Sequence, residues 1–324
     1  MNRTLPALLI GVSVFGTTLP GPLFAQEYPS RPIRLVVPWP PGGGTDVIAR
    51  LIAAKLSDSL GQQVVVDNRP GAASNIGMAS VAQAAPDGYT IALATSNLAV
   101  NPALFSPMTF DPARDLAPIT TVAKGTYALA LNPAVPARTV AELIALVRAA
   151  PGKYNASTAG AGSPGHLAVA QFNSMTRADL TAVHYKGGGP AAAATLAGET
   201  QMMFSSYTTM APLVKSGRLH LLAVTGPRRS LAVPDVPTVA ESGLPGFVFE
   251  EWYALFAPAK TARERIDRLN AEVRKVLAQP DVRDRILSLG AEVGQDTPEV
   301  LGAMVTSEIA RWGALVRAAG IKAD

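Results

Sequence analysis

The chain has 324 residues but no cysteine, only three histidines, and charged residues at only 16% of positions. The absence of cysteine excludes disulfides, thiolate metal sites and a cysteine nucleophile. Basic residues are scattered and form no Lys/Arg stripe, so we expect no nucleic-acid partner. Long apolar runs are scarce, and beyond residue 25 none reaches the ~20 residues that a membrane-spanning helix needs. Hydrophobic residues make up 48% of the chain, which is long enough for two lobes with their own cores.

The first 25 residues differ from the rest of the chain. Arg3 precedes an uncharged apolar stretch from Leu5 to Leu19, and Pro20-Gly21-Pro22 breaks the run before Leu23-Phe24-Ala25. This pattern predicts a secretory signal peptide, residues 1–25, cleaved after Ala25. A membrane anchor is the alternative, but Gly and Pro interrupt a run that is shorter than the ~20 residues of a span. We therefore expect the mature protein in the periplasm.

A short stretch after the leader reads as a strand, a Gly-rich loop and a helix start. The apolar run Ile33–Val37 is followed by Gly42-Gly43-Gly44, and a helical pattern then covers Asp46–Leu60. Such a loop presents unpaired backbone N–H groups at the positive end of a helix, which suits an anion. No Gly-Lys-Ser/Thr follows at the spacing of a nucleotide P-loop. The stretch predicts a carboxylate site.

Strand–loop–helix alternation continues along the chain and indicates an α/β fold. We predict two lobes, each a mostly parallel sheet flanked by helices, with a ligand cleft between them. The chain should cross between lobes near Lys124 and Glu250. Lobe 1 is then discontinuous, with residues 27–124 and 250–324, and lobe 2 comprises residues 125–249. The segment Asn101–Pro118 is expected to be irregular, and Phe247–Phe256 is expected to be a strand.

Four Gly-rich loops stand between predicted strands and helices, two in each lobe. Ligands of open α/β sheets bind beyond the carboxyl ends of the strands, where helix N-termini converge. We expect these loops to hold a carboxylate from both sides. Ser163 at the N-cap with Pro164 at the first helical position is a strong helix-start signature. The loops are Gly42–Asp46, Gly71–Asn75, Gly160–His166 and Lys186–Pro190.

The third loop has two other interpretations. Gly160–Gly165 matches the dinucleotide pattern G-x-G-x-x-G, but Asp179 lies before the next predicted strand rather than at its end, where it would meet a ribose. We therefore expect no dinucleotide and no cofactor. Ser163 and His166 also allow an interpretation as a nucleophile and base, although Ser163 is better used as an N-cap and no acidic orienter is evident. An exported hydrolase remains the enzymatic alternative.

Eight segments, in order along essentially all of the mature chain, match one known family. They are Tyr28–Ile33, Pro41–Asp46, Asp67–Ala72, Gly160–Ser163 with His166-Leu167, Tyr185–Gly188, Leu222–Thr225, Pro234–Glu241 and Trp252–Pro258. Through them the chain resembles the substrate-binding proteins of tripartite tricarboxylate transporters, the Bug family of extracytoplasmic solute receptors.

The resemblance implies a type II-like, two-lobed periplasmic binding-protein fold that closes over a small organic acid. It implies a non-enzymatic receptor, expected to be a monomer without metal or cofactor, that delivers its ligand to membrane permease subunits. The loop matching Gly42–Asp46 would grip a carboxylate through backbone amides, and the loop matching Thr158–His166 would add side-chain donors. The candidate ligand-binding residues are Trp39, Gly42, Gly43, Gly44, Thr45, Asp46, Ala73, Ser74, Thr158, Ser163, His166, Lys186, Gly188, Ser205, Ser206 and Glu251.

Departures from the family pattern bear on the ligand. Relatives commonly carry an acidic residue where this chain has Ala194, which argues against an amino-acid ligand unless Glu251 meets the ammonium group. Ser205 and Ser206 are small and leave room for a larger or aromatic acid. Citrate-like, dicarboxylic, aromatic and amino acids all remain open. A sensor that presents its ligand to a membrane signalling partner is the second alternative.

Overall fold

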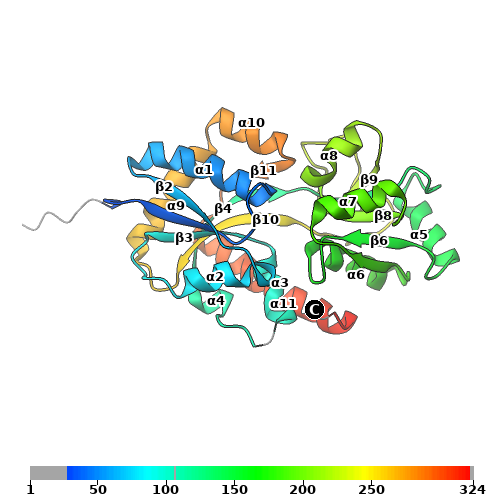
Figure 1. Ribbon diagram of the computed structural model, residues 1–324, viewed down its shortest axis with the longest axis horizontal. Helices are drawn as coiled ribbons and strands as arrows, with labels where there is room; N and C mark the ends of the chain where they lie inside the picture. Colours follow the sequence, from blue (N-terminus) through cyan, green and yellow to red (C-terminus); the bar gives the residue numbers. More distant parts are fainter. Residues whose placement is uncertain (1–27, 106, 322–324) are drawn as a thin grey trace, which may run out of the picture.

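The computed structural model describes residues 28–105 and 107–321. They form two lobes, each a mixed β-sheet flanked by helices, side by side along the long axis of the molecule (Figure 1). The predicted α/β class with two lobes is confirmed. The predicted signal peptide lies outside the described residues. Within the described ranges, no helix is long and apolar enough to cross a membrane.

Lobe 1 is built on a six-stranded sheet of order β11-β4-β10-β3-β1-β2. Its strands are β1 (Ile33–Val37), β2 (Val64–Asn68), β3 (Thr90–Thr95), β4 (Leu116–Gly125), β10 (Glu251–Pro258) and β11 (Ala291–Val293). Its helices are α1 (Gly44–Leu60), η1 (Ala72–Ser74), α2 (Asn75–Ala82), α3 (Asn97–Leu104), α4 (Pro112–Asp115), α9 (Arg263–Leu277), α10 (Pro280–Ser288) and α11 (Pro298–Ala319).

Lobe 2 is built on a five-stranded sheet of order β7-β6-β8-β5-β9. Its strands are β5 (Tyr127–Leu131), β6 (Asn155–Thr158), β7 (Thr181–His184), β8 (Met202–Ser206) and β9 (His220–Val224). Its helices are α5 (Val140–Ala149), α6 (Pro164–Thr176), α7 (Gly188–Ala197) and α8 (Tyr207–Lys215).

The two sheets repeat one topology. In each, the strand that arrives from the other lobe (β10 or β5) inserts antiparallel between the third and fourth strands of its own lobe. The first strand (β1 or β6) pairs in parallel with the second and third. Most strands of each sheet run in one direction, as predicted, and β10 and β5 make the sheets mixed. The antiparallel pairs of β10 and β5 follow directly from the two crossings of the chain.

The register shows where the loops must lie. Gly125, the last residue of β4, pairs with Glu251, and Ser206, the last residue of β8, pairs with Tyr127. Both pairs lie at the junction of the lobes, where β4 leads into β5. Because β1 and β3 run in the direction of β4, and β6 in the direction of β8, the carboxyl ends of these strands face the other lobe. The predicted loops therefore meet across the junction.

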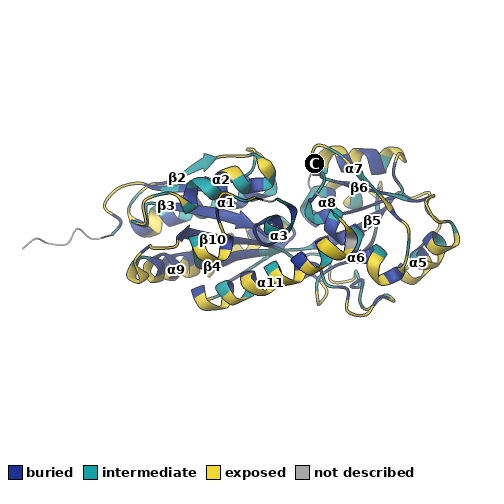
Figure 2. Cartoon of the chain, turned by 90° about the horizontal axis from the view of Figure 1, so that it is seen from below, coloured by how far each residue is buried: buried dark blue, intermediate teal, exposed yellow. Residues whose placement is uncertain are grey.

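Long-range packing also ties the lobes together. Helix α11 runs along the underside of lobe 1 and reaches α6 of lobe 2, with its outer face exposed (Figure 2). Its Trp312 ring packs 5.1 Å from Phe249, which in turn lies 5.0 Å from Tyr127. One buried apolar cluster runs through these rings and includes residues from both sheets.

Two predicted elements are corrected. Asn101–Pro118 is not simply irregular, because α3, α4 and the start of β4 cover much of it. Helix α3 tolerates Pro102 and buries Leu98 and Val100 against α11, a tertiary contact that local sequence does not reveal. The strand expected over Phe247–Phe256 begins only at Glu251, since the preceding segment forms the second crossing.

Candidate functional site

The N-terminus of α1 has backbone donors without acceptors. Its N-cap is Gly43, which has no side chain to cap the helix, and the first helical bond runs from Val47 N–H to the Gly43 carbonyl at 3.0 Å. The N–H groups of Gly44, Thr45 and Asp46 have no hydrogen-bond partner among the residues that the structure describes. Three such donors at the positive end of a 17-residue helix are the arrangement that suits an anion.

Asp46 holds this loop in shape. Its Oδ2 accepts from Gly42 N–H and Arg50 Nε, both at 2.9 Å, and its Oδ1 accepts from Asn68 Nδ2 at 2.9 Å. Burial opposes ionisation, but these hydrogen bonds outweigh it and lower the pKa of Asp46. Asn68 also donates to the carbonyl of Trp39, whose ring is half-buried and donates to Thr95. The geometry gives the Asp46 carboxylate a positioning part in the loop.

The N-terminus of α6 follows the same path with different chemistry. Gly162 N–H donates to His166 Nδ1 at 3.1 Å, which matches the Gly42–Asp46 bond four residues apart. Ser163 accepts from His166 N–H at 3.4 Å, which confirms its predicted N-cap role. Pro164 has no N–H, and the Gly165 N–H donates to the Tyr127 hydroxyl. The first-turn donors of α6 are therefore used within the protein.

The predicted side-chain donors of lobe 2 have partners in that lobe. Thr158 Oγ1 lies 2.7 Å from His184 Nδ1, and the His184 ring packs 4.5 Å from that of His166. His166 Nδ1 accepts from the Gly162 N–H, and Ser163 Oγ accepts from the His166 N–H, so both side chains serve the start of α6. Whether these side chains touch a ligand stays a prediction.

The second loop of lobe 1 is strained. Ala72, Ala73 and Ser74 have φ values of 46°, 49° and 84°, a left-handed region that is unfavourable for residues other than glycine. Asn101 holds them, since its Nδ2 donates to the Ala73 carbonyl at 2.8 Å. Ser74 is buried. Strain of this kind concentrates at functional sites.

The fourth loop is shorter than predicted, because α7 begins at Gly188. Lys186 is exposed just before it, and Gly188 is half-buried. Ala194 is buried on the same helix.

A polar cluster connects the two helix ends at the junction. Tyr253 donates to Glu251 Oε2 at 3.0 Å, and a Cβ added to Gly44 would lie 3.8 Å from the Tyr253 hydroxyl. Ser206 also hydrogen-bonds the Glu251 carboxyl. Tyr127, which accepts from the amide of Gly165 in α6, interacts electrostatically with Glu251. Burial raises the pKa of Glu251 to about 7.

Sequence reasoning missed part of this site. Tyr127 was not among the candidate residues, and its contact with Gly165 of α6 exists only because the fold brings β5 and α6 together. Ser96 directly follows β3, and its buried Oγ has no hydrogen-bond partner within the described chain. Ser205 is buried in β8, beside Ser206.

Most aromatic side chains near the junction belong to the core. Phe204 and Trp252 are buried in the apolar cluster shared by the lobes, and Tyr207 packs in the core of lobe 2. Trp39 and Tyr253 are instead tied to the α1 loop.

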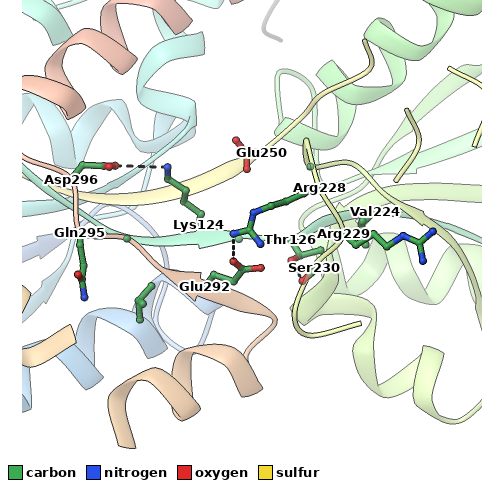
Figure 3. Close-up of a pocket in the computed structure, with 14 residues that line it drawn as sticks. Lys124, Thr126, Val224, Arg228, Arg229, Ser230, Glu250, Glu292, Gln295 and Asp296 are labelled. Atoms are coloured by element: carbon green, nitrogen blue, oxygen red, sulfur yellow. Dashed lines mark hydrogen bonds and ion pairs between the residues drawn. The ribbon is translucent and has the colours of Figure 1, made fainter. Parts of the chain in front are cut away.

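A separate cavity of about 230 Å³ lies at the junction and contains none of the predicted ligand-binding residues. Figure 3 shows Arg228 of lobe 2 reaching Glu292 of lobe 1, with an N–O distance of 2.5 Å. Glu250 also lines the cavity, whereas Glu251 faces the polar cluster. The neighbouring side chains of Glu250 and Glu251 therefore face two different places, this cavity and the polar cluster. We call the cavity the hinge cavity.

Known proteins share this architecture. The model of the tripartite tricarboxylate transporter family receptor matches residues 48–321. Protein BugT of Bordetella pertussis is 36% identical over 324 residues, covering 99% of both chains. The solved structure of R. palustris Rpa4515 with adipate is 35% identical, with a TM-score of 0.83 over 91% of this chain and 99% of that one.

MatC from Rhodopseudomonas palustris, solved with bound malate, is 34% identical, with a TM-score of 0.79 over 89% of this chain and 100% of that one. These likenesses extend over most of the chain. The chain belongs to the tripartite tricarboxylate transporter receptor family, the Bug family of periplasmic solute-binding proteins.

Proposed function

We propose that the protein captures a small organic carboxylate between its lobes in the periplasm and delivers it to a tripartite tricarboxylate transporter. The observation that carries this proposal is the N-terminus of α1, where Gly44, Thr45 and Asp46 present N–H groups without acceptors among the described residues. Charge-assisted hydrogen bonds to a carboxylate are about twice as strong as neutral ones. An anion there is favoured by the helix dipole as well.

The ligands of relatives support the chemical class. Adipate in Rpa4515 and malate in MatC are both aliphatic dicarboxylates. This chain offers the same kind of ligand two helix N-termini facing across one junction, although only that of α1 has open donors. We propose an aliphatic dicarboxylate as the first class to test.

Lobe movement would occur at the two crossings. Lobe 1 would comprise residues 27–124 and 250–324, and lobe 2 residues 125–249, closing as a monomer about Gly125 and Glu250. Hinges of this kind occupy a few residues at element ends. Gly125 ends β4, and Glu250 directly precedes β10.

A thermal-shift screen of organic acids, each paired with its amide, tests the binding function. A ligand at about 100 times its dissociation constant adds about 2.7 kcal/mol to the free energy of unfolding. Adipate should raise the melting temperature, whereas adipamide should not. Equal shifts for acid and amide would contradict the carboxylate mechanism. Transport is tested separately, since deletion of the gene should abolish uptake of the acid that binds.

A further inference from the structure

Glu251 places a carboxyl group beside the site proposed for an anion. Its Oε2 accepts from Tyr253 at 3.0 Å, and the Tyr253 hydroxyl lies next to Gly44, the first residue of α1. On its other side, Glu251 pairs in register with Gly125 at the hinge between β4 and β5. The side chain therefore stands between the open helix end and the second lobe.

The groups that face Glu251 are neutral hydrogen-bonding groups. They come from β10, β8 and β5, and are the hydroxyls of Tyr253, Ser206 and Tyr127. In the described part of the chain, Glu251 forms no ion pair with Lys, Arg or His. A half-buried carboxylate without a cation is costly, and the protonated acid is favoured.

The charged side chains on the neighbouring elements are engaged elsewhere. Lys124 of β4 lies 3.9 Å from Asp296, and Glu292 of β11 binds Arg228. Asp46 of α1 is bound by Arg50 and by its own loop. None of these pairs supplies a counter-charge to Glu251.

We propose that Glu251 is protonated when a dicarboxylate is bound, so that binding above neutral pH takes up one proton from solvent. This inference rests on the proposed function. The protonated acid can donate a hydrogen bond to a ligand oxygen, whereas the carboxylate would repel it. Glu251 is thus a specificity-determining residue that favours acids over amines.

The pKa of Glu251 agrees with this role. Burial raises the pKa of Glu251 to about 7, and hydrogen bonds from Tyr253 and Ser206 offset only part of that shift. At pH 8 the free protein therefore holds Glu251 mainly ionised, and an anionic ligand must restore the proton. With one coupled proton, affinity falls about tenfold for each pH unit well above this pKa.

Isothermal titration calorimetry with malate and the series from succinate to adipate tests the inference. Titrations at pH 6, 7 and 8 give the dissociation constants, and buffers with different ionisation heats give the number of protons taken up. Wild-type protein should take up close to one proton at pH 8 and close to none at pH 6. Glu251→Gln, whose amide donates as the protonated acid does, should bind at all three pH values with the same affinity.

Glu250→Gln is the matched control, because it removes the same charge one residue away on the side of the hinge cavity. It should keep the pH dependence of the wild type. The inference is overturned if Glu251→Gln follows the wild-type pH curve, or if wild-type affinity rises with pH, as it would for an ammonium ligand. Failure of every dicarboxylate to bind also overturns it, while a monocarboxylate that binds in the thermal-shift screen would leave the proposed function standing.

Discussion

The two lobes share a strand order and a loop design, yet their helix ends are chemically opposite. In lobe 1, Asp46 accepts the N–H of Gly42, and in lobe 2, His166 accepts the N–H of Gly162. The helix that follows is left open at Gly44–Asp46, whereas Ser163, Pro164 and the Tyr127 hydroxyl complete the matching helix of lobe 2. Two lobes of the same topology therefore need not bind a ligand in the same way. We therefore assign the proposed anion site to lobe 1.

The largest effect should come from giving α1 the helix start of α6. Gly43→Ser with Gly44→Pro supplies a capping hydroxyl for the Asp46 N–H and removes the Gly44 N–H. The backbone at Gly43, φ −78° and ψ 168°, suits serine as it does at Ser163. Two lost bonds to a charged ligand, each about 1.5–3 kcal/mol, should weaken binding by about 100-fold or more in calorimetry.

Stability is the control for this double variant. Serine at the N-cap and proline at the first helical position both favour the helix, so its melting temperature should not fall. If a well-folded double variant kept its affinity for the ligand, the open amides of α1 would not be the anion site.

The next effect concerns packing in lobe 2. Gly165 lets α6 approach β8 closely, because an added Cβ would lie 2.5 Å from the Phe204 carbonyl oxygen. The matching position of lobe 1 is occupied by Thr45. Gly165→Ala should lower the free energy of unfolding by up to about 3 kcal/mol, as overpacked cores do. Urea denaturation measures this, and an unchanged midpoint would show that α6 is not held as described.

The junction between the lobes should show a pH effect on stability. The folded pKa of Glu251 is about 7 and its ordinary value is 4.5, so the folded state binds more protons between these values. The free energy of unfolding should therefore fall as pH rises from about 4.5 to 7, by about 2–3 kcal/mol from this group.

Glu251→Gln removes that contribution. Its advantage over wild type in denaturant titrations should grow from pH 5 to pH 8. A constant difference across this range would mean that Glu251 has an ordinary pKa.

The two loop-closing side chains should differ in their effect on affinity. Asp46→Ala removes the acceptor of Gly42 N–H, Arg50 and Asn68, and should cost about 2 kcal/mol, or about 30-fold, in calorimetry. His166→Ala should change affinity less than threefold, about 0.6 kcal/mol, since the amides of α6 bind within the protein. If His166→Ala weakened binding more than Asp46→Ala, the anion site would lie in lobe 2.

The smallest effect is a gain in stability. Ala73 has a φ of 49°, so Ala73→Gly relieves strain and should raise the free energy of unfolding by about 1 kcal/mol. Ala79→Gly, inside α2, should lower it by a similar amount. Loss of stability in both variants would show that the left-handed turn carries no strain.

Local signals in the sequence predicted most elements and much of the helix-end chemistry. Gly61 ends α1 in the left-handed conformation, and Ser163 with Pro164 starts α6, as their sequences indicate. Four loops of similar composition, however, looked equivalent. The difference between them depends on Tyr127 reaching Gly165, a contact between residues 38 positions apart that composition does not reveal.

The same limit applies to the strands and to buried polar groups. Strand β11 has three residues and is stabilised by its pairing with β4, so its local pattern was too short to detect. Asp46 was predicted as a ligand-binding residue, but its three hydrogen bonds come from a loop and two other side chains that only the folded chain brings together.

A crystal structure of the protein with adipate would test the central claim most directly. The account predicts one carboxylate of the ligand at the N-terminus of α1, with an oxygen about 2.7–3.1 Å from the backbone nitrogens of Gly44, Thr45 or Asp46. It also predicts that the first-turn amides of α6 keep their bonds to Ser163 and Tyr127. A carboxylate bound at α6 or in the hinge cavity, with the α1 amides bonded only to water, would contradict the account.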